Sequence, residues 1–136
     1  MLANRVRNLE LDAAIIAELP EPDVEMTSLR LIEEKMMVVA PPDYELSSWR
    51  AILAAYPFIR LNRHAGMGKV IDSALKENQV QVQEVVELDS SEFVIGMVRA
   101  GLGAGVIPTG RLRQIPPAER LSQCPSASCP FTCGWC

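Results

Sequence analysis

The chain has 136 residues and a formal net charge of −4, with 49% hydrophobic and 22% charged residues, which suits a single globular domain. The excess of acidic over basic residues argues against a free-standing nucleic-acid-binding protein. No apolar run approaches the roughly 18 to 20 residues of a membrane span, and the N-terminus lacks the apolar core of a signal peptide. We therefore expect a cytoplasmic protein that does not associate with membranes.

The first predicted elements are two apolar strands. LDAAIIA at 11–17 is a short apolar run followed by a Pro-Glu-Pro turn at 20–22. EKMMVVA at 34–40 ends at Pro41 and Pro42, which cannot continue a β-ladder. Continuous apolar strands are typical of sheets that helices cover on both faces.

Helices and strands then alternate along the chain. The apolar residues of 45–56 have helical spacing and predict a helix, which the strand PFIRL at 57–61 follows. The apolar stripe of MGKVIDSALKEN, at 67–78, predicts a second helix. The Val-rich, partly alternating segment 80–88 predicts another strand.

A third helix is expected within 89–101, which opens with capping residue types and has an acid in its first turn. Its apolar residues lie on almost all sides of the helix, so we expect the helix to be well buried. The last strand is AGVIP at 104–108. This order of elements predicts an α/β fold with a mostly parallel sheet flanked by helices.

The glycines of AGLGAGVIPTG, at 100–110, raise the question of a phosphate-binding loop. Such a loop follows a strand and precedes a helix, whose N-terminus then faces the phosphate. Here the helix comes first, so we reject a nucleotide site. Gly101 is expected to end the helix in the left-handed conformation, and Gly103 and Gly105 to allow a sharp turn with close packing.

MVRAGLGAGVIP resembles the lVaaGlGia-lP segment in the effector-binding domain of LysR-type transcriptional regulators. LELDAAI is similar to the family's G-x-LD-ai strand, and LRLIEEKMMVVAPPDYEL to its pL-x-x-E-x-l-vlv-x-p-x-HPL segment. YPFIRLNRHAGMGKVIDSAL and VVELDSSEFVIGMVRAG resemble two further strand, loop and helix segments. The likeness covers Leu9 to Pro108, and Leu9 stands where the family commonly has Gly.

The resemblance implies a fold like that of type 2 periplasmic binding proteins, with two lobes, two crossover strands and a small effector between the lobes. Under it the chain divides into a first-lobe remnant with the first crossover (1–40), the second lobe (41–103), the return crossover (104–108) and an atypical tail (109–136). The implied hinge residues are Ala40, Pro41, Gly105 and Pro108. The family's winged helix-turn-helix and most of the first lobe have no counterpart in this sequence, so we interpret the chain as a fragment truncated at both ends.

The resemblance and the carboxyl ends of the predicted strands place an effector site in two loops. Its candidate residues are Asn62, Arg63, His64, Ala65, Gly66, Ser90 and Ser91. Arg63 and a helix start would favour an anionic effector. The alternative is a solvated loop, together with serines that only cap a helix. His64 is the only histidine and has no evident partner, so we expect no catalytic residue, metal or cofactor.

The four cysteines lie in the tail at Cys124, Cys129, Cys133 and Cys136. A structural zinc site usually pairs two C-x2-C units, and a redox C-x-x-C needs a thiolate at a helix N-terminus. We therefore interpret the tail as disordered and not native to the family, as a frameshift would leave it. Zinc binding and incidental disulfides remain as alternatives.

The sequence thus favours a fragment of a LysR-type regulator that senses a small anionic metabolite and reaches DNA only through a part absent from this chain. The alternatives are a solute-binding protein of a transport system and a truncated product without function. An enzyme is disfavoured because no nucleophile–base pair, metal cluster or phosphate loop is evident. The incomplete first lobe would leave strand edges and apolar surface open, so we expect self-association.

Overall fold

The computed structural model describes residues 2–17, 26–42, 48–64, 66–113, 115, 121–123 and 132–135. Within these residues the helices are α1 (Leu2–Arg7), α2 (Trp49–Ala55), α3 (Gly66–Glu77), α4 (Ser91–Arg99) and α5 (Thr109–Leu112). The strands are β1 (Ile32–Ala40), β2 (Phe58–Leu61), β3 (Glu84–Leu88), β4 (Ala104–Pro108), β5 (Ser122–Gln123) and β6 (Thr132–Trp135).

The strands form one sheet in the order β3-β2-β4-β1-β5, with β6 paired to β1 outside this path. β2 runs parallel to β3 and β4, whereas β1 runs antiparallel to β4, β5 and β6. The predicted α/β class, with a sheet flanked by helices, is confirmed. The sheet is mixed rather than mostly parallel, because β1 carries the chain into the body and the adjacent β4 carries it back out.

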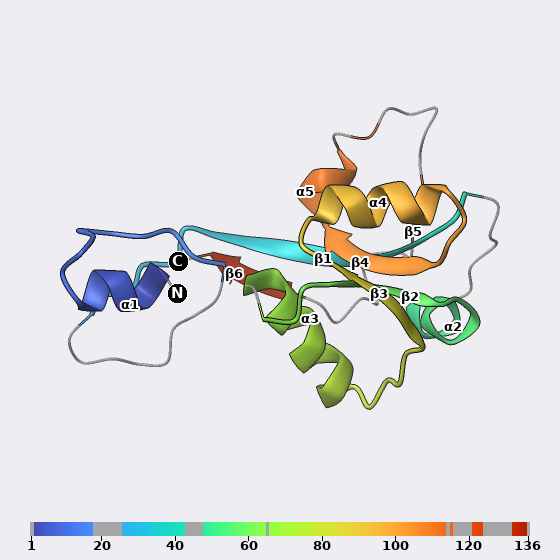
Figure 1. Cartoon of the computed structure of the whole chain (residues 1–136), viewed down its shortest axis with the longest axis horizontal. Coiled ribbons are helices and arrows are strands. Elements are labelled where there is room, and N and C mark those ends of the chain that lie inside the picture. The colour runs from blue at the N-terminus through green and yellow to red at the C-terminus, as the bar shows by residue number, and fades with distance from the viewer. Residues whose placement is uncertain are drawn as a thin grey trace.

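Helices cover both faces of this sheet (Figure 1). α2 and α3 lie on one face, where α2 packs against β1 and β4 and α3 against β2. α4 and α5 lie on the other face, where α4 packs against β2 and β4. The packing of α4 is close: a Cβ on Gly105 of β4 would lie 2.6 Å from Cγ1 of Val94. The close packing expected at Gly105 is therefore confirmed.

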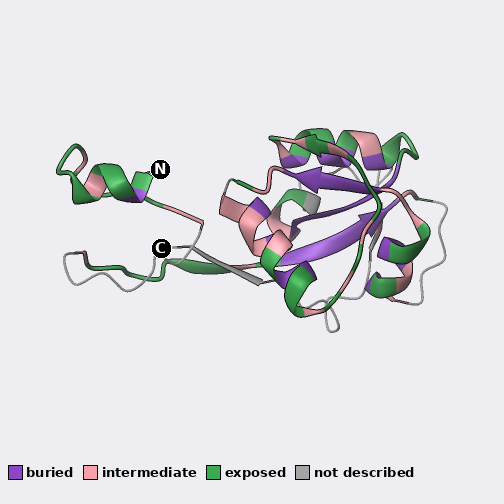
Figure 2. Cartoon of the chain, turned by 60° about the horizontal axis from the view of Figure 1, so that its bottom comes forward, coloured by how far each residue is buried: buried purple, intermediate pink, exposed green. Residues whose placement is uncertain are grey.

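An arm extends from the body along the first half of β1, which pairs with β6 (Figure 2). α1 also lies away from the body. The burial of β1 changes along its length, because Ile32 is 60% exposed whereas the strand is buried from Met36 onward. The half of β1 that lies between α2 and α4 therefore belongs to the core.

The predicted strand at 11–17 is wrong. These residues form neither strand nor helix, and Ile15 is 66% exposed. An apolar run becomes a strand only where another strand offers it backbone partners, and none of the described strands pairs with 11–17. The strand predicted at 80–88 is confirmed only from Glu84, since 80–83 precede β3.

The described parts of the tail include two short strands, and the disorder expected for the tail as a whole stays a prediction. β5 pairs with the end of β1, and β6 with its beginning. The exposed edge of β1 offers backbone groups that tail residues can pair with whatever their side chains are. Cys133 lies in β6, whereas Cys124, Cys129 and Cys136 lie outside the described residues. No helix in the described part of the chain is long and apolar enough to span a membrane.

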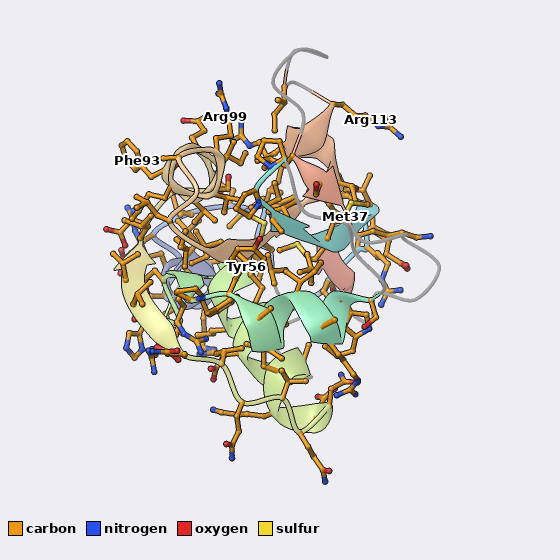
Figure 3. The ribbon with its side chains drawn as sticks, turned by 90° about the vertical axis from the view of Figure 1, so that its right-hand side faces the viewer. Met37, Tyr56, Phe93, Arg99 and Arg113 are labelled. Atoms are coloured by element: carbon orange, nitrogen blue, oxygen red, sulfur yellow. The ribbon has the colours of Figure 1, made fainter. Side chains whose placement is uncertain are left out.

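α4 begins as predicted but is less buried than expected. Oγ of Ser90 accepts the backbone N–H of Glu92 at 3.2 Å, which confirms the N-terminal cap. Phe93 is 67% exposed, and it projects from α4 away from the sheet, as does Arg99 (Figure 3). The prediction of burial all round is wrong, because only one face of α4 meets the sheet.

The C-terminus of α4 forms the predicted glycine cap. Gly101 has a φ of +77°. Its N–H donates to the carbonyl of Val98 at 3.0 Å, and the N–H of Leu102 donates to that of Met97 at 3.1 Å. These are the two bonds of a Schellman motif, which needs a left-handed residue at this position.

The same motif occurs twice with side chains that disfavour it. Gln79, after α3, has a φ of +55°, and the N–H groups of Gln79 and Val80 donate to the carbonyls of Lys76 and Leu75. Leu9, after α1, has a φ of +57°. The left-handed backbone at position 9 therefore explains why glycine is common there in the family that the sequence resembles, because a Cβ strains this conformation.

We expect Gln79→Gly to raise the free energy of unfolding by about 1 kcal/mol, because it relieves the left-handed strain at the end of α3. The matched change is Gly101→Ala, which introduces the same strain where a Cβ meets nothing within 4 Å. It should lower the free energy of unfolding by about 1 kcal/mol. Urea unfolding measures both, and shifts of the same sign would contradict this account of the caps.

Candidate functional site

The carboxyl ends of the parallel strands lie at one edge of the sheet. There β2 leads to α3 on one face, whereas its neighbours β3 and β4 lead to α4 and α5 on the opposite face (Figure 1). Open α/β sheets bind ligands where connections leave neighbouring strands in opposite directions. The two predicted loops, 62–66 and 89–91, follow β2 and β3 at this edge.

Asn62 joins these two loops. Its backbone N–H donates to the carbonyl of Leu88 at 2.8 Å, and its Nδ2 donates to Oδ1 of Asp89 at 2.6 Å. Its Oδ1 accepts the backbone N–H of His64 at 2.9 Å, which closes a local turn. The structure thus brings Asn62 and His64 next to the start of the Ser90 loop. Ala65 lies outside the described residues.

Arg63 is paired with acids on β3. Its Nε donates to Oε2 of Glu87 at 3.1 Å and its Nη2 to Oε2 of Glu84 at 2.5 Å. Its backbone N–H donates to Oε1 of Glu87 at 3.0 Å. Glu87 and Glu84 raise the pKa of Arg63, and the Arg63 backbone and guanidinium lower the pKa of Glu87. The cation expected to attract an anionic effector is therefore already matched by two carboxylates.

α3 starts directly against the loop backbone. A Cβ on Gly68 would lie 1.8 Å from the carbonyl oxygen of Asn62, so only glycine fits this contact. A Cβ on Gly66 would lie 3.3 Å from Cβ of Ala17. The N-terminal segment that fails to form a strand therefore reaches the first turn of α3.

The two serines differ in their surroundings. Ser90 caps α4, and its hydroxyl oxygen acts there as an acceptor. The O–H of Ser90 is still able to donate. Ser91 is buried, with 7% of its surface exposed. Capping is thus confirmed for Ser90, and a contact of either serine with an effector stays a prediction.

Three of the four residues predicted as hinges lie on paired strands. Gly105 faces Val39 and Pro108 faces Met36 in the antiparallel pair of β4 with β1. Ala40 pairs with Ser122 of β5 and Pro41 follows it. Just beyond Pro108, the backbone N–H of Gly110 donates to Oε1 of Glu34 on β1 at 3.1 Å. These contacts hold the two strands together, and their action as a hinge stays a prediction.

Arg60, a buried cation on β2, was not among the site residues expected from the sequence. Its side chain is 4% exposed, and its Nη1 lies 3.0 Å from Oδ1 of Asp72 on α3. Its Nη2 donates to Oε1 of Glu84 on β3, and its guanidinium lies over the ring of Phe58 with 5.3 Å to the centroid. An arginine within the apolar run PFIRL was the available signal, because a buried charge is costly unless it is paired.

The acids around Arg60 are held in their charged forms. Lys76, whose Nζ lies 2.7 Å from Oδ2 of Asp72, lowers the pKa of Asp72, and Arg60 adds to this. Arg60, followed by Arg63, lowers the pKa of Glu84. In the described part of the chain no group of three histidine, cysteine or acidic side chains is arranged to hold a metal.

The depressed pKa values give the chain an acid-dependent stability. Since the folded pKa values of Asp72 and Glu84 lie below their ordinary values of 3.8 and 4.5, stability is fully present above this range and is lost as the pH falls through the folded values. Glu84→Gln should therefore flatten the fall of the free energy of unfolding below pH 4.5. Urea unfolding across this pH range is the measurement, with the exposed Glu77→Gln as control. Equal slopes in the two variants would contradict the role of Glu84.

Gly68→Ala should lower the free energy of unfolding by about 3 kcal/mol, because α3 and the loop must separate to admit the methyl group. Gly96→Ala is the matched control: it lies within α4, where a Cβ meets nothing within 4 Å. It should raise stability by about 0.5 to 1 kcal/mol through helix propensity alone. Thermal unfolding compares the two, and a neutral Gly68→Ala would show that α3 does not abut the loop.

The mixed α/β sheet flanked by helices has a periplasmic-binding-protein-like fold. The chain belongs to the LysR substrate binding domain family, whose model matches residues 1–134. The resemblance found in the sequence is therefore confirmed.

Relatives and solved structures agree with this assignment. The chain is 25% identical over 111 residues to an uncharacterized HTH-type transcriptional regulator of Bacillus subtilis, YybE, across 79% of this chain and 38% of that protein. The regulatory domain of Synechocystis PCC6803 CcmR, in complex with 2-PG, matches with a TM-score of 0.82 and 22% identity, over 98% of this chain and 66% of that one. The effector binding domain of QuiR, in complex with shikimate, matches with a TM-score of 0.67 and 15% identity, over the same shares. The chain thus spans less than half the length of the curated regulator.

Proposed function

We propose that the chain is the effector-sensing part of a LysR-type transcriptional regulator and that it binds a small anionic metabolite at the edge formed by β2 and β3. The observation that carries this proposal is the Asn62–Asp89 hydrogen bond, which joins the two candidate loops at the starts of α3 and α4. Helix N-termini present N–H groups and a partial positive charge, and they favour anions.

The proposed contacts are Asn62, His64, Ala65, Gly66, Ser90 and Ser91. Arg63, the other residue expected from the sequence, already pairs with Glu84 and Glu87. The exposed His64 and the free donor capacity of the Ser90 hydroxyl support direct contacts. Shikimate, which is bound to the matching domain of QuiR, is a carboxylate, and this supports an anion as the effector class.

The response to the effector would pass through the crossover strands. The antiparallel pair of β1 and β4 supports the proposed division into a first-lobe part (1–40), a second lobe (41–103) and a return strand (104–108), with 109–136 following. An effector that prefers one arrangement of the lobes would shift the equilibrium between arrangements. In a longer regulator a winged helix-turn-helix would read this shift on DNA, in the cytoplasm. Self-association is part of the proposal, since Leu29 and Ile32 are 72% and 60% exposed.

Shikimate and then other small carboxylates, titrated into the 15N-labelled chain, test the binding proposal. We expect saturable shifts of the backbone amides of 62–64 and 89–91. Ser90→Ala should weaken binding roughly tenfold through the loss of a hydrogen bond to a charged group. It also removes a helix cap worth about 1 kcal/mol, so binding is measured well below the melting temperature.

The control is Ser73→Ala, which removes an exposed hydroxyl from the middle of α3. Its affinity should equal that of the unchanged chain. A panel of acids that produces no saturable shift in the two loops would overturn the proposed function.

A further inference from the structure

Most of the hydrogen bonds of the loop at 62–64 are made with β3. The backbone N–H of Asn62 donates to the carbonyl of Leu88, and that of Arg63 to the carboxylate of Glu87. The Arg63 guanidinium then reaches back along β3 to Glu84, 21 residues away in sequence. The position of this loop therefore depends on where the acids of β3 are fixed.

Glu84 is shared between two guanidiniums. Its Oε2 accepts from Nη2 of Arg63 at 2.5 Å, while its Oε1 accepts from Arg60. Arg60 is itself held by Asp72 at 3.0 Å and is nearly sealed from solvent, whereas the side chain of Arg63 is 40% exposed. One carboxylate thus connects a rigid buried cation to a loop at the surface.

The charges in this group balance. Its cations are Arg60, Arg63 and Lys76, and its anions are Asp72, Glu84 and Glu87. Three positive charges face three negative ones, so the group has no excess cation. An anion that bound to Arg63 would have to displace a carboxylate that already makes a charge-assisted hydrogen bond.

We propose that Arg60 and Glu84 are positioning residues for the loop 62–64. Arg63 connects Glu84 to the loop and is not the anion-binding group. Only the assignment of the loop 62–64 to an effector site rests on the proposed function. The positioning itself concerns contacts within the chain and can be tested without a ligand.

Hydrogen exchange of the backbone amides of Arg63 and His64 in the full chain tests this inference. The Arg63 amide donates to Glu87, and the His64 amide donates to the side chain of Asn62. Glu84→Gln should speed their exchange roughly tenfold, as expected for the loss of a hydrogen bond between charged groups. Arg60→Lys, which does not touch the loop, should speed it roughly threefold, because an ammonium lacks the fork that holds two carboxylates. Glu77→Gln removes the same charge at the end of α3 and should have no effect.

Exchange at Ile59 and Val106, in the buried strands, separates local opening from general destabilisation. In both variants we expect these two amides to stay within about twofold of their rates in the unchanged chain. If Glu84→Gln matched Glu77→Gln at Arg63 and His64, or if Ile59 and Val106 accelerated equally, the inference would be overturned. If Glu84→Gln does not fold, Arg60→Lys decides by the same criteria.

A separate titration with a ligand keeps the two proposals distinct. Shikimate titrated into the unchanged chain reports on the proposed function, and the exchange rates report on positioning. If shikimate binds, Arg63→Gln should weaken it no more than Glu84→Gln does, since both release the same loop. A far larger loss of shikimate affinity for Arg63→Gln, roughly a hundredfold as for a direct pair of charges, would show that Arg63 binds the anion. It would overturn the proposal that Arg63 only connects Glu84 to the loop.

Discussion

A buried guanidinium on β2, the strand next to the edge strand β3, sets the arrangement of its surroundings. Arg60 lies on β2, and its charge is tolerable there only if carboxylates reach it from neighbouring elements. Asp72 comes from α3 and Glu84 from β3, so one side chain fixes a helix and a strand relative to β2. Both the loop after β2 and the loop after β3 start from positions that this group determines.

The second constraint is the pairing of β1 with β4. β4 is parallel to β2 on one side and antiparallel to the second half of β1 on the other, so it joins β1 to the parallel part of the sheet. Gly105 permits this central place, since Val94 of α4 lies where a Cβ would be. The arm leads away from the body, as expected if β1 and β4 connect two lobes in the longer members of the family.

Local features were predictable from the sequence, and pairings between distant residues were not. The cap of α4 at Ser90 and its end at Gly101 follow from a few neighbouring residues, and both were predicted correctly. The strand expected at 11–17 failed because its apolar run has no described partner strand. The partners of Arg63 lie 21 and 24 residues away, so sequence suggested a free cation where the structure has a matched one.

The same distinction applies to the candidate site. The family resemblance located the two loops, and the structure joins them through Asn62 and Asp89. The resemblance did not identify Arg60. The single charge within PFIRL indicates a buried ion pair but does not reveal which acids will meet it. The exposure of Phe93 was missed for a related reason, because an apolar helix face is buried only where another element covers it.

A double-mutant cycle between Arg60 and Glu84 tests most directly the claim that this buried pair organises the site. The free energies of unfolding of Arg60→Met, Glu84→Gln and the double variant are compared with that of the unchanged chain. The account predicts that the double variant loses at least about 1 kcal/mol less than the sum of the single losses. Losses that add to within about 0.5 kcal/mol would contradict it, because they would show that the two side chains act independently.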